Sequence, residues 1–298
     1  MTAHETPVRA VFDRADAERA TPDLIEGLRC DRSTRVLVVR GDTAPFAEPG
    51  RLAYTAPDVA PDDAEWAFLG RDERGAVLAA VVGATDPAPF DAPAGWVSFR
   101  VAGGALDEGE AGVFVEALSL GRWLRDAPFC PACGSRTRLE LGGWARRCPS
   151  CGRQHFPRTD PAVIVAVTSR VDPDRLLLGS NAAWEQNRYS CFAGFVEAGE
   201  SLESAVVREV GEEAGVEVVD VLYRGSQPWP YPRSLMVGFT AAAASDRAAR
   251  PDGDEILDVR WFHRDEIRAA LAGDGDVLLP GPASIAHRLI SGWQRGTL

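Results

Sequence analysis

The stretch GFVEAGESLESAVVREVGEEAGV, residues 194–216, decides how this sequence is interpreted. It predicts a glycine-rich turn followed by a short helix whose last turns carry three carboxylates, Glu209, Glu212 and Glu213. Successive residues are about 100° apart around a helix, so Glu209 and Glu213 lie within roughly 40° of each other. Carboxylates this close repel one another and destabilise the helix unless water or a cation separates them.

The carboxylate cluster has two explanations. A lone ExxEE pattern is typical of a solvated acidic helix face, which needs no ligand. Alternatively, the cluster holds Mg²⁺ or Mn²⁺, which prefer oxygen ligands and usually serve phosphate chemistry. The spacing around the cluster favours a metal site: Gly194 is followed after five residues by Glu200, and after seven more by the run REVGEEAGV, residues 208–216. Arg208 is expected to brace the neighbouring carboxylates.

The helix itself is well specified by its sequence. Ser201 is expected to be the N-cap, and Gly215 suits the turn that ends a helix. An inward apolar stripe is predicted for one face of the helix. Its members are Leu202, Ala205, Val206 and Val210.

Composition limits the class of protein. No apolar run approaches the ~20 residues of a membrane span, and residues 1–10 lack the layout of a signal peptide. The sequence therefore predicts a cytoplasmic protein. The net charge of −12 argues against general affinity for nucleic acids or anionic membranes, although a local basic patch is compatible with it.

Four of the six cysteines have the spacing of a metal site. They form C-x2-C, a gap of 14 residues, and C-x2-C: Cys130, Cys133, Cys148 and Cys151. Four thiolates close a tetrahedral shell, which indicates one structural Zn²⁺. A redox pair or two disulfides are the alternatives, and a cytoplasmic setting disfavours both. The two remaining cysteines, Cys30 and Cys191, are expected to be buried thiols.

Arginines gather around these cysteines. This basic density could contact the phosphates of a ligand or of RNA, or it could be an ordinary solvated surface. The arginines concerned are Arg136, Arg138, Arg146, Arg147, Arg153 and Arg158, against the acids Glu140 and Asp160.

The order of expected elements predicts an α+β protein with three domains. Residues 1–125 form a β-rich support or dimerisation domain, with strands at 35–41 and 51–57, a hairpin around 72–75 and a helix at 108–126. Residues 126–157 form the zinc ribbon. Residues 158–298 predict an α/β/α sandwich with a mixed sheet. Its expected elements include a hairpin of strands 160–170 and 175–181, a strand at 258–263 and a helix at 282–295. No internal repeat stands out.

A stiff loop follows the carboxylate helix. In SQPWPYPRS, residues 226–234, three prolines alternate with Trp229 and Tyr231. Rings held this way can stack on a nucleobase or nicotinamide, while Gln227 and Ser234 supply hydrogen bonds. Alternatively, the loop packs on another subunit.

Together these motifs resemble the NADH pyrophosphatase family, the NudC-like Nudix hydrolases. Residues 194–216 have every fixed position of the Nudix box, the four-cysteine ribbon precedes it, and the family motif SQPWPFPxS follows with Tyr231 in place of Phe. The resemblance implies that two or three catalytic Mg²⁺ or Mn²⁺ ions bind to Glu209, Glu213, Glu255 and the carbonyl of Ala193. It also implies zinc on the four cysteines. Arg208, Glu212 and Glu200 complete the catalytic set, with Glu212 or Glu200 as base.

The resemblance further implies a substrate site. Its loop contacts are Gln227, Pro228, Trp229, Pro230, Tyr231, Pro232, Arg233 and Ser234, and its more distant contacts are Arg100, Phe156 and Ala286. Gly143 stands where relatives can have a substrate-contacting Glu, so that contact is not expected here.

The implied reaction is hydrolysis of the pyrophosphate of NADH, and of NAD⁺, to nicotinamide mononucleotide and AMP. The arginine-rich ribbon suggests a second activity, the removal of NAD caps from RNA. The family resemblance also implies a homodimer. One alternative is a Nudix hydrolase for ADP-ribose or dinucleoside polyphosphates. Another is a catalytically silent nucleotide sensor or nucleic-acid-binding regulator, which the intact carboxylates disfavour.

Overall fold

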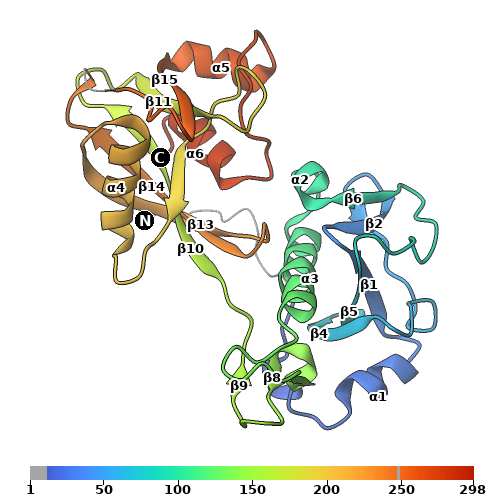
Figure 1. The fold of residues 1–298 in the computed structure, drawn as a ribbon. Coiled ribbons are helices and arrows are strands. Elements are labelled where there is room, and N and C mark those ends of the chain that lie inside the picture. Colours follow the sequence, from blue (N-terminus) through green and yellow to red (C-terminus); the bar gives the residue numbers. More distant parts are fainter. Residues whose placement is uncertain (1–11, 247–248) are drawn as a thin grey trace. The chain divides into compact units, whose positions relative to one another are not determined.

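The structure, a computed structural model, describes residues 12–246 and 249–298. Residues 1–10, considered above for a signal peptide, lie outside the described residues. The described chain divides into two compact units (Figure 1). The N-terminal unit holds residues 12–159 and Trp229–Arg233, and the C-terminal unit holds Asp160–Pro228 and Ser234–Leu298. Every helix in the described ranges is too short or too polar to span a bilayer.

The N-terminal unit is built on a six-stranded sheet. Its strands are β1 (Arg35–Arg40), β2 (Thr43–Glu48), β3 (Arg51–Leu52), β4 (Glu65–Asp72), β5 (Gly75–Val82) and β6 (Trp96–Ser98). Its helical elements are η1 (Asp16–Glu18), α1 (Leu24–Cys30), α2 (Phe99–Ala102) and α3 (Glu108–Asp126). The predicted hairpin is the β4–β5 turn, and the predicted helix is α3. The strand expected over 51–57 forms as the two-residue strand β3, followed by a single antiparallel bridge between Thr55 and Val36 of β1.

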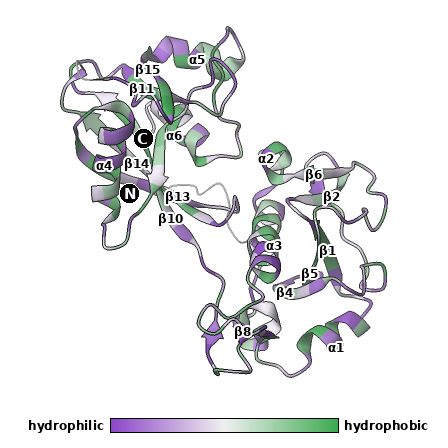
Figure 2. Cartoon of the chain, viewed as in Figure 1, coloured by the Kyte–Doolittle hydropathy of each residue, from purple (hydrophilic) through white to green (hydrophobic). Residues whose placement is uncertain are grey.

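Hydrophobic alternation explains this sheet. The run RVLVVR of β1 directs Leu37 and Val39 into the core shared with α3, and Val36 and Val38 into the core on the other face. Figure 2 shows β1 as a hydrophobic strand. Helix α3 starts where the Asp107 side chain accepts a hydrogen bond from the amide of Glu110, which satisfies one of the unpaired amides of the first turn.

The ribbon is a small three-stranded sheet within the N-terminal unit. Its elements are β7 (Arg138–Glu140), η2 (Leu141–Gly143), β8 (Ala145–Arg147) and β9 (Gln154–His155), in the order β7-β8-β9. Trp144 Nε1 donates to the Phe68 carbonyl at 2.7 Å, and Arg146 donates to the Leu124 carbonyl at 2.5 Å. These bonds fasten the ribbon to β4 and α3. Since the compact units separate only after Thr159, the three-domain division stays a prediction.

The C-terminal unit is an α/β/α sandwich. Its elements are β10 (Asp160–Ser169), β11 (Arg175–Asn181), β12 (Phe192–Phe195), α4 (Leu202–Ala214), β13 (Val218–Trp229), β14 (Ser234–Ala243), β15 (Ile256–His263), α5 (Arg264–Ala272) and α6 (Ile285–Arg295). The sheet is mixed, since β10 pairs parallel with β14 and antiparallel with β11. Along β10, Val163, Val165 and Val167 pack with α4, whereas Ile164 and Ala166 pack with α5 and α6. The predicted fold class is confirmed.

The two units follow the same strand path, which the sequence did not reveal. The C-terminal order is β13-β14-β10-β11 with β15 pairing β11, and the N-terminal order is β4-β5-β1-β2 with β6 pairing β2. In both units the first strand is parallel to the fourth strand that follows it, β1 to β5 and β10 to β14. The chain therefore contains a similar strand path twice, with one difference: β12 pairs with β10, whereas β3 pairs with β2.

Candidate active site

Helix α4 places the carboxylates where the sequence predicts. Ser201 caps it by accepting a hydrogen bond from the amide of Ser204 at 3.2 Å, and Gly215 ends it at φ 64°. Ala205, Val206 and Val210 are fully buried against the sheet. Because α4 is fixed by this buried face, its carboxylates have defined positions at the edge of the core.

Arg208 binds the carboxylates around it. Its Nη1 donates to Glu209 Oε1 at 2.9 Å and to Glu212 Oε2 at 3.0 Å, and its Nε donates to Glu200 Oε1 at 2.9 Å. Its Nη2 donates to the second oxygen of Glu200 and to the Phe195 carbonyl, both at 2.9 Å. The hydrogen bonds from Arg208 hold the pKa of Glu200 below its ordinary value. One guanidinium thus fixes three acids and the preceding turn.

Glu213 is the most constrained carboxylate of the group. Its side chain is only 6% exposed, and its Oε2 is buried without a hydrogen-bond partner among the described residues. Burial, followed by repulsion from Glu209 and Glu255, raises the pKa of Glu213 to about 8. Burial also raises the pKa of Glu209. Buried like charges of this kind are stabilised by a bound cation.

The strand beside α4 is shaped to receive these carboxylates. A Cβ built on Gly194 would overlap the carboxylate of Glu209. The preceding residue, Ala193, donates its amide to Glu213. The space that Gly194 leaves open is therefore occupied by one of the expected metal ligands, and Ala193 lies beside another.

Glu255 approaches from the loop before β15. Asp252 Oδ1 accepts hydrogen bonds from the amides of Asp254, Glu255 and Ile256 at 2.8–3.0 Å, which shapes this loop. Asn181 Nδ2 donates to Glu255 Oε1 at 3.2 Å. Glu255 contributes repulsion to both Glu209 and Glu213, so the three expected ligands share one electrostatic environment. They are nevertheless more widely separated than the cysteines described next.

The four cysteines converge as a metal site. Across residues 12–246 and 249–298, they alone form a group of three or more such ligands whose donor atoms lie within 4.8 Å of one another. Cys130 Sγ and Cys151 Sγ are 3.7 Å apart, and Cys133 Sγ and Cys148 Sγ are 3.4 Å apart. Gly134 and Gly152, which follow the two pairs, both adopt φ 73°. Two matching turns thus aim four sulfurs at one point, which fits tetrahedral zinc.

Gln227 acts inside the fold. Its side chain is fully buried, its Nε2 donates to the Ala283 carbonyl at 2.7 Å, and its Oε1 accepts from the Ile285 amide at 2.6 Å. Both ends of the amide are therefore used to hold the start of α6. This differs from the expected role of its side chain as a hydrogen-bonding group for a ligand. Ser234 is also buried.

The tip of the proline-rich loop, Trp229–Arg233, belongs to the N-terminal unit. The Trp229 ring lies 6.2 Å from Phe99 and 5.3 Å from Tyr231. The Tyr231 hydroxyl accepts from the Arg100 amide at 3.3 Å, and the Arg100 guanidinium lies 3.9 Å from the centre of the Tyr231 ring. The rings of Trp229 and Tyr231 are thus half-buried by contacts within their own chain, rather than fully exposed for stacking on a ligand.

The other expected substrate contacts are placed separately. Phe156 is 42% exposed in the N-terminal unit, and Arg100 is exposed. Ala286 of α6 is buried in the core between this helix and the sheet, so its methyl group serves packing. Within the loop, Pro230 is buried, Pro228 is half-buried, and Pro232 and Arg233 are exposed.

Two expectations about surface and burial are wrong. Cys30 is exposed, because it is the last residue of α1, whereas Cys191 is buried as expected. Arg146 is buried under the ribbon, where it bonds to Leu124, and Arg147 pairs with Glu140 at 2.7 Å. The basic surface is therefore smaller than its sequence suggests, and its exposed members without that pairing are Arg136, Arg138, Arg153 and Arg158.

Sequence reasoning missed two side chains. Phe195 follows Gly194 directly, is 54% exposed, and has its carbonyl fixed by Arg208, so an open aromatic ring lies next to the carboxylate helix. Its position inside the glycine-rich turn was the available signal. Arg122 of α3 lies 5.2 Å from the centre of the Tyr231 ring, and nothing in the local sequence indicates that contact.

Comparisons with known proteins agree with this site. Family models match three consecutive parts of the chain: an NADH pyrophosphatase-like rudimentary NUDIX domain (7–123), an NADH pyrophosphatase zinc ribbon domain (125–156) and a NUDIX domain (158–280). NAD-capped RNA hydrolase NudC of Mycobacterium bovis (strain BCG / Pasteur 1173P2) is 42% identical over 300 residues, covering 96% of this chain and 93% of its own length. Human NAD-capped RNA hydrolase NUDT12 is 42% identical over 202 residues, covering 64% of this chain and 43% of its own.

Among solved structures, a NUDIX hydrolase from Nitrosomonas europaea is 25% identical and covers 51% of this chain and 96% of its own, with a TM-score of 0.39. The carboxylate helix and the matched domain define a Nudix hydrolase, a pyrophosphatase that works with divalent metal ions. The chain belongs to the NADH pyrophosphatase family of these enzymes, the family of NudC, with its four-cysteine zinc ribbon.

Proposed function

We propose that this enzyme hydrolyses the pyrophosphate bond of NADH, and of NAD⁺, to nicotinamide mononucleotide and AMP. The observation that carries the proposal is the buried, unpartnered carboxylate of Glu213 beside Glu209 on the helix of a complete Nudix box. The 42% identity to NudC over nearly the whole chain supports the choice of an NAD-containing substrate.

Mg²⁺ or Mn²⁺ ions are the proposed catalytic cofactors. Glu209, Glu213 and Glu255 would hold them together with the Ala193 carbonyl, because an all-oxygen donor set suits these hard cations. When bound, such ions neutralise phosphate charge and acidify water. The orphaned Oε2 of Glu213 and the space kept open by Gly194 fit this role.

The chain's own residues have separate tasks in this proposal. The hydrogen bond from Arg208 holds the Glu209 side chain in one orientation, which it keeps when the substrate binds. Of the two candidate bases, Glu200 has both oxygens bonded to Arg208, whereas Glu212 is bonded through one oxygen and is 61% exposed. We therefore assign Glu212 as the residue that accepts the proton of the attacking water. Stacking on a nucleobase or nicotinamide stays a prediction for Trp229, Tyr231 and Phe156 of the N-terminal unit. In the C-terminal unit, Phe195 is the aromatic side chain that we assign to stacking.

Product analysis tests the reaction directly. NADH is incubated with the enzyme and Mg²⁺ in ¹⁸O-water, and both products are examined by mass spectrometry. The expected result is nicotinamide mononucleotide and AMP, with one ¹⁸O atom in one of them, which also names the phosphorus attacked. A panel with ADP-ribose and dinucleoside polyphosphates decides between substrates. If ADP-ribose or a dinucleoside polyphosphate is turned over faster than NADH, that compound replaces NADH as the proposed substrate. Binding of NADH without cleavage would favour a silent sensor.

Removal of the NAD cap from RNA is the second proposed activity, since it breaks the same bond. The exposed Arg136, Arg138, Arg153 and Arg158 offer positive charge to an RNA backbone, and the relatives NudC and NUDT12 are NAD-capped RNA hydrolases. NAD-capped RNA and free NADH are compared at equal concentration. Intact caps at an enzyme level that consumes all NADH would exclude this activity.

The enzyme's assembly and location are proposed from family and composition. We assign it as a cytoplasmic homodimer, in which the N-terminal domain, residues 1–125, supports the ribbon (126–157) and the hydrolase domain (158–298). Light scattering during size-exclusion chromatography measures the mass directly. A species of 32.0 kDa at micromolar concentration would contradict the dimer.

A further inference from the structure

The two units share a strand path but differ at one segment. In the C-terminal unit, the residues between β11 and β13 form β12 and α4, the helix of Glu209 and Glu213. In the N-terminal unit, the residues between β2 and β4 contain only the two-residue strand β3. This part of the N-terminal unit therefore has no carboxylate helix, and its side chains can serve another purpose.

A pocket of about 720 Å³ opens at this segment. One wall is formed by residues 51–56, which follow β2 as the α4 segment follows β11. Another wall includes Phe90 and Asp91, which precede β6 as Glu255 precedes β15. The pocket thus occupies the place in the N-terminal topology that the active site occupies in the C-terminal one. Its volume lies in the range of small-molecule sites.

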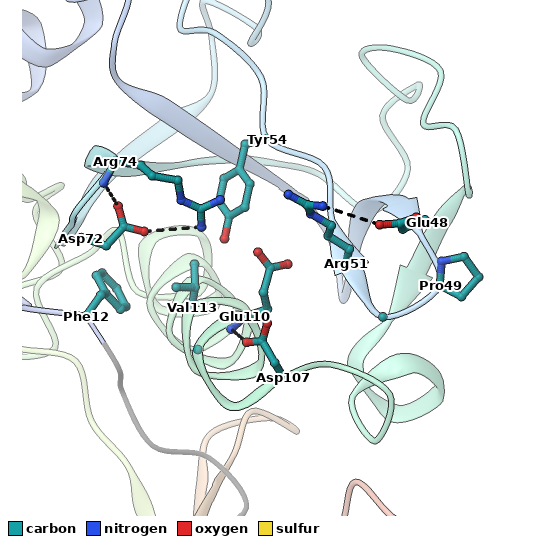
Figure 3. A pocket seen from close by; sticks show the side chains of 12 residues that line it. Phe12, Glu48, Pro49, Arg51, Tyr54, Asp72, Arg74, Asp107, Glu110 and Val113 are labelled. Atoms are coloured by element: carbon teal, nitrogen blue, oxygen red, sulfur yellow. Dashed lines mark hydrogen bonds and ion pairs between the residues drawn. The ribbon is translucent and has the colours of Figure 1, made fainter.

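A second pocket of about 440 Å³ adjoins the first. The two share Arg51, Tyr54, Arg74 and Glu110 among their lining residues. Figure 3 shows Tyr54 between Arg74 and Arg51, with the Glu110 carboxylate on the side of its hydroxyl. The Leu52 amide donates to Glu110 Oε2 at 2.5 Å, which fixes this carboxylate. The guanidinium groups of Arg51 and Arg74, the Tyr54 ring and the Glu110 carboxylate therefore lie together at the boundary of the two pockets.

The lining of the larger pocket contains more basic than acidic side chains, whereas the adjoining pocket has Glu48, Asp72, Asp107 and Glu110 beside Arg51 and Arg74. The larger pocket is lined by four arginines, Arg32, Arg35, Arg51 and Arg74, against the two acids Asp91 and Glu110, although the chain carries a net charge of −12. Arg51 comes from the segment between β2 and β4, Arg74 from the β4–β5 turn, and Arg32 and Arg35 from just before and at the start of β1. Guanidinium groups bind phosphate through charge-assisted, often paired hydrogen bonds.

Two of these arginines have only weak partners. Arg35 is committed to Asp72 at 2.5 Å. Arg51 contacts Glu48, and Arg74 contacts Asp72, at 3.6 Å, and these arginine side chains remain 62% and 59% exposed. Exposed pairs at such distances contribute little to stability. Arg51 and Arg74 can therefore turn to an incoming anion at small cost.

The lining also contains a buried polar group that lacks a partner. Thr34 is only 2% exposed, and its hydroxyl makes no hydrogen bond within the described residues. A buried hydroxyl left unpaired is costly, so a ligand or water in the pocket would satisfy it. Other parts of the wall are apolar, including Val59, Phe90 and Pro93. A bare phosphate would leave most of this volume and wall unused.

We propose that this arginine-lined pocket is a second ligand site, which binds a nucleoside monophosphate through Arg51 and Arg74. The phosphate lies on the two guanidinium groups. The ribose hydroxyls donate to Glu110, and the base rests on the apolar wall. Binding does not depend on the proposed function, but if that function holds, both products of the reaction belong to this class of ligand.

AMP binding without a catalytic ion tests the site. The full-length, zinc-loaded protein is titrated with AMP by calorimetry in buffer without added Mg²⁺ or Mn²⁺, since arginine–phosphate pairs need no metal. The expected result is saturable binding that weakens at least about tenfold in Arg51→Ala/Arg74→Ala, as expected for two charge-assisted contacts, and weakens with added salt. The matched control is Arg125→Ala, an exposed arginine outside both pockets.

Photochemical labelling locates the ligand. With 8-azido-AMP, the label is expected on peptides from residues 32–93 and is expected to disappear in the double variant. Unchanged AMP affinity in that variant, or label confined to the C-terminal unit, would overturn the proposal. Tighter binding of an RNA oligonucleotide lacking a 5′-phosphate would also overturn it. NADH turnover with Mg²⁺ is measured on the same samples, so absent turnover with intact AMP binding rejects only the proposed function.

Discussion

Glu209 on α4 occupies the space that a side chain on Gly194 would need. The strand β12 therefore accepts only glycine at this position if the carboxylate is to stay where Arg208 holds it. Gly194 is not in the left-handed region of φ. Its requirement for glycine arises from the close approach of strand and helix rather than from backbone conformation.

Gly194→Ala is expected to displace Glu209 and weaken activity without unfolding the protein. Disturbed positioning of a metal ligand typically costs about 10–100-fold in affinity or activity. NADH turnover as a function of Mn²⁺ concentration measures the loss. Gly211→Ala is the control, because a Cβ at this helical position meets nothing within 4 Å. Equal activity of the two variants would show that Glu209 is not a ligand.

Glu213→Gln is expected to lower turnover by about 10²–10³-fold or more, as for loss of a central electrostatic group. Because the pKa of Glu213 is raised from 4.5 to about 8 in the folded chain, Gln resembles the protonated side chain; thermal stability without added ions is therefore expected to equal that of the parent below pH 4.5 and to exceed it increasingly as the pH rises to about 8. Glu203→Gln, an exposed acid in the first turn of the same helix, is expected to change neither quantity. A near-normal rate in Glu213→Gln would place the ion elsewhere.

Cys148→Ser is expected to abolish zinc binding and lower the melting temperature. Cys148 is fully buried in the ribbon, and structural zinc supplies folding free energy. Metal content is measured by mass spectrometry and unfolding by calorimetry. Cys30→Ser is expected to retain zinc, since Cys30 is exposed and outside the cluster. A zinc content unaffected by Cys148→Ser would contradict the assignment.

Tyr231→Phe tests the hydroxyl that replaces the family's phenylalanine. Its hydrogen bond to the Arg100 amide is long, at 3.3 Å, and hydrogen bonds of this kind contribute about 0.5–1.5 kcal/mol. The KM for NADH is therefore expected to rise by less than about tenfold, with kcat unchanged. Tyr231→Ala also removes the ring contacts with Trp229 and Arg100 and is expected to raise KM further. An equal KM in both variants would leave the ring without a positioning role.

Glu116 gives the N-terminal unit a pH-dependent stability. It is 5% exposed in α3, and burial raises its pKa from 4.5 to about 7 against the attraction of Arg14 and Arg19. The folded chain thus holds this proton more tightly than the unfolded chain. Stability is therefore lost as the pH rises from 4.5 to about 7, and the loss is complete above that range.

Glu116→Gln is expected to remove this dependence. At pH 8 the variant should be more stable than the parent by about 1–3 kcal/mol, since each unit of pKa shift corresponds to about 1.4 kcal/mol. At pH 5 the advantage should be much smaller. Melting temperatures of the two proteins across this pH range measure the difference. A constant difference would show that Glu116 does not titrate in this range.

Local signals in the sequence were sufficient for several elements. Ser201 and Gly215 set the ends of α4 because capping depends on residues within one turn. The two C-x2-C pairs converge because each is a short turn with its own glycine. By contrast, burial of Gln227 and Arg146 depends on residues far away in sequence, at Ala283 and Leu124, and was not predicted.

The sequence by itself determined the chemistry, because the spacing of carboxylates on one helix and of cysteines in two turns is a local property of the chain. The tertiary structure alone decided that the N-terminal unit repeats the strand path of the hydrolase unit and gathers arginines from three of its segments at one pocket. Strand pairing joins residues distant in sequence, and no local pattern records it. For the same reason, only the fold brought Arg51, Arg74 and Glu110 to one pocket.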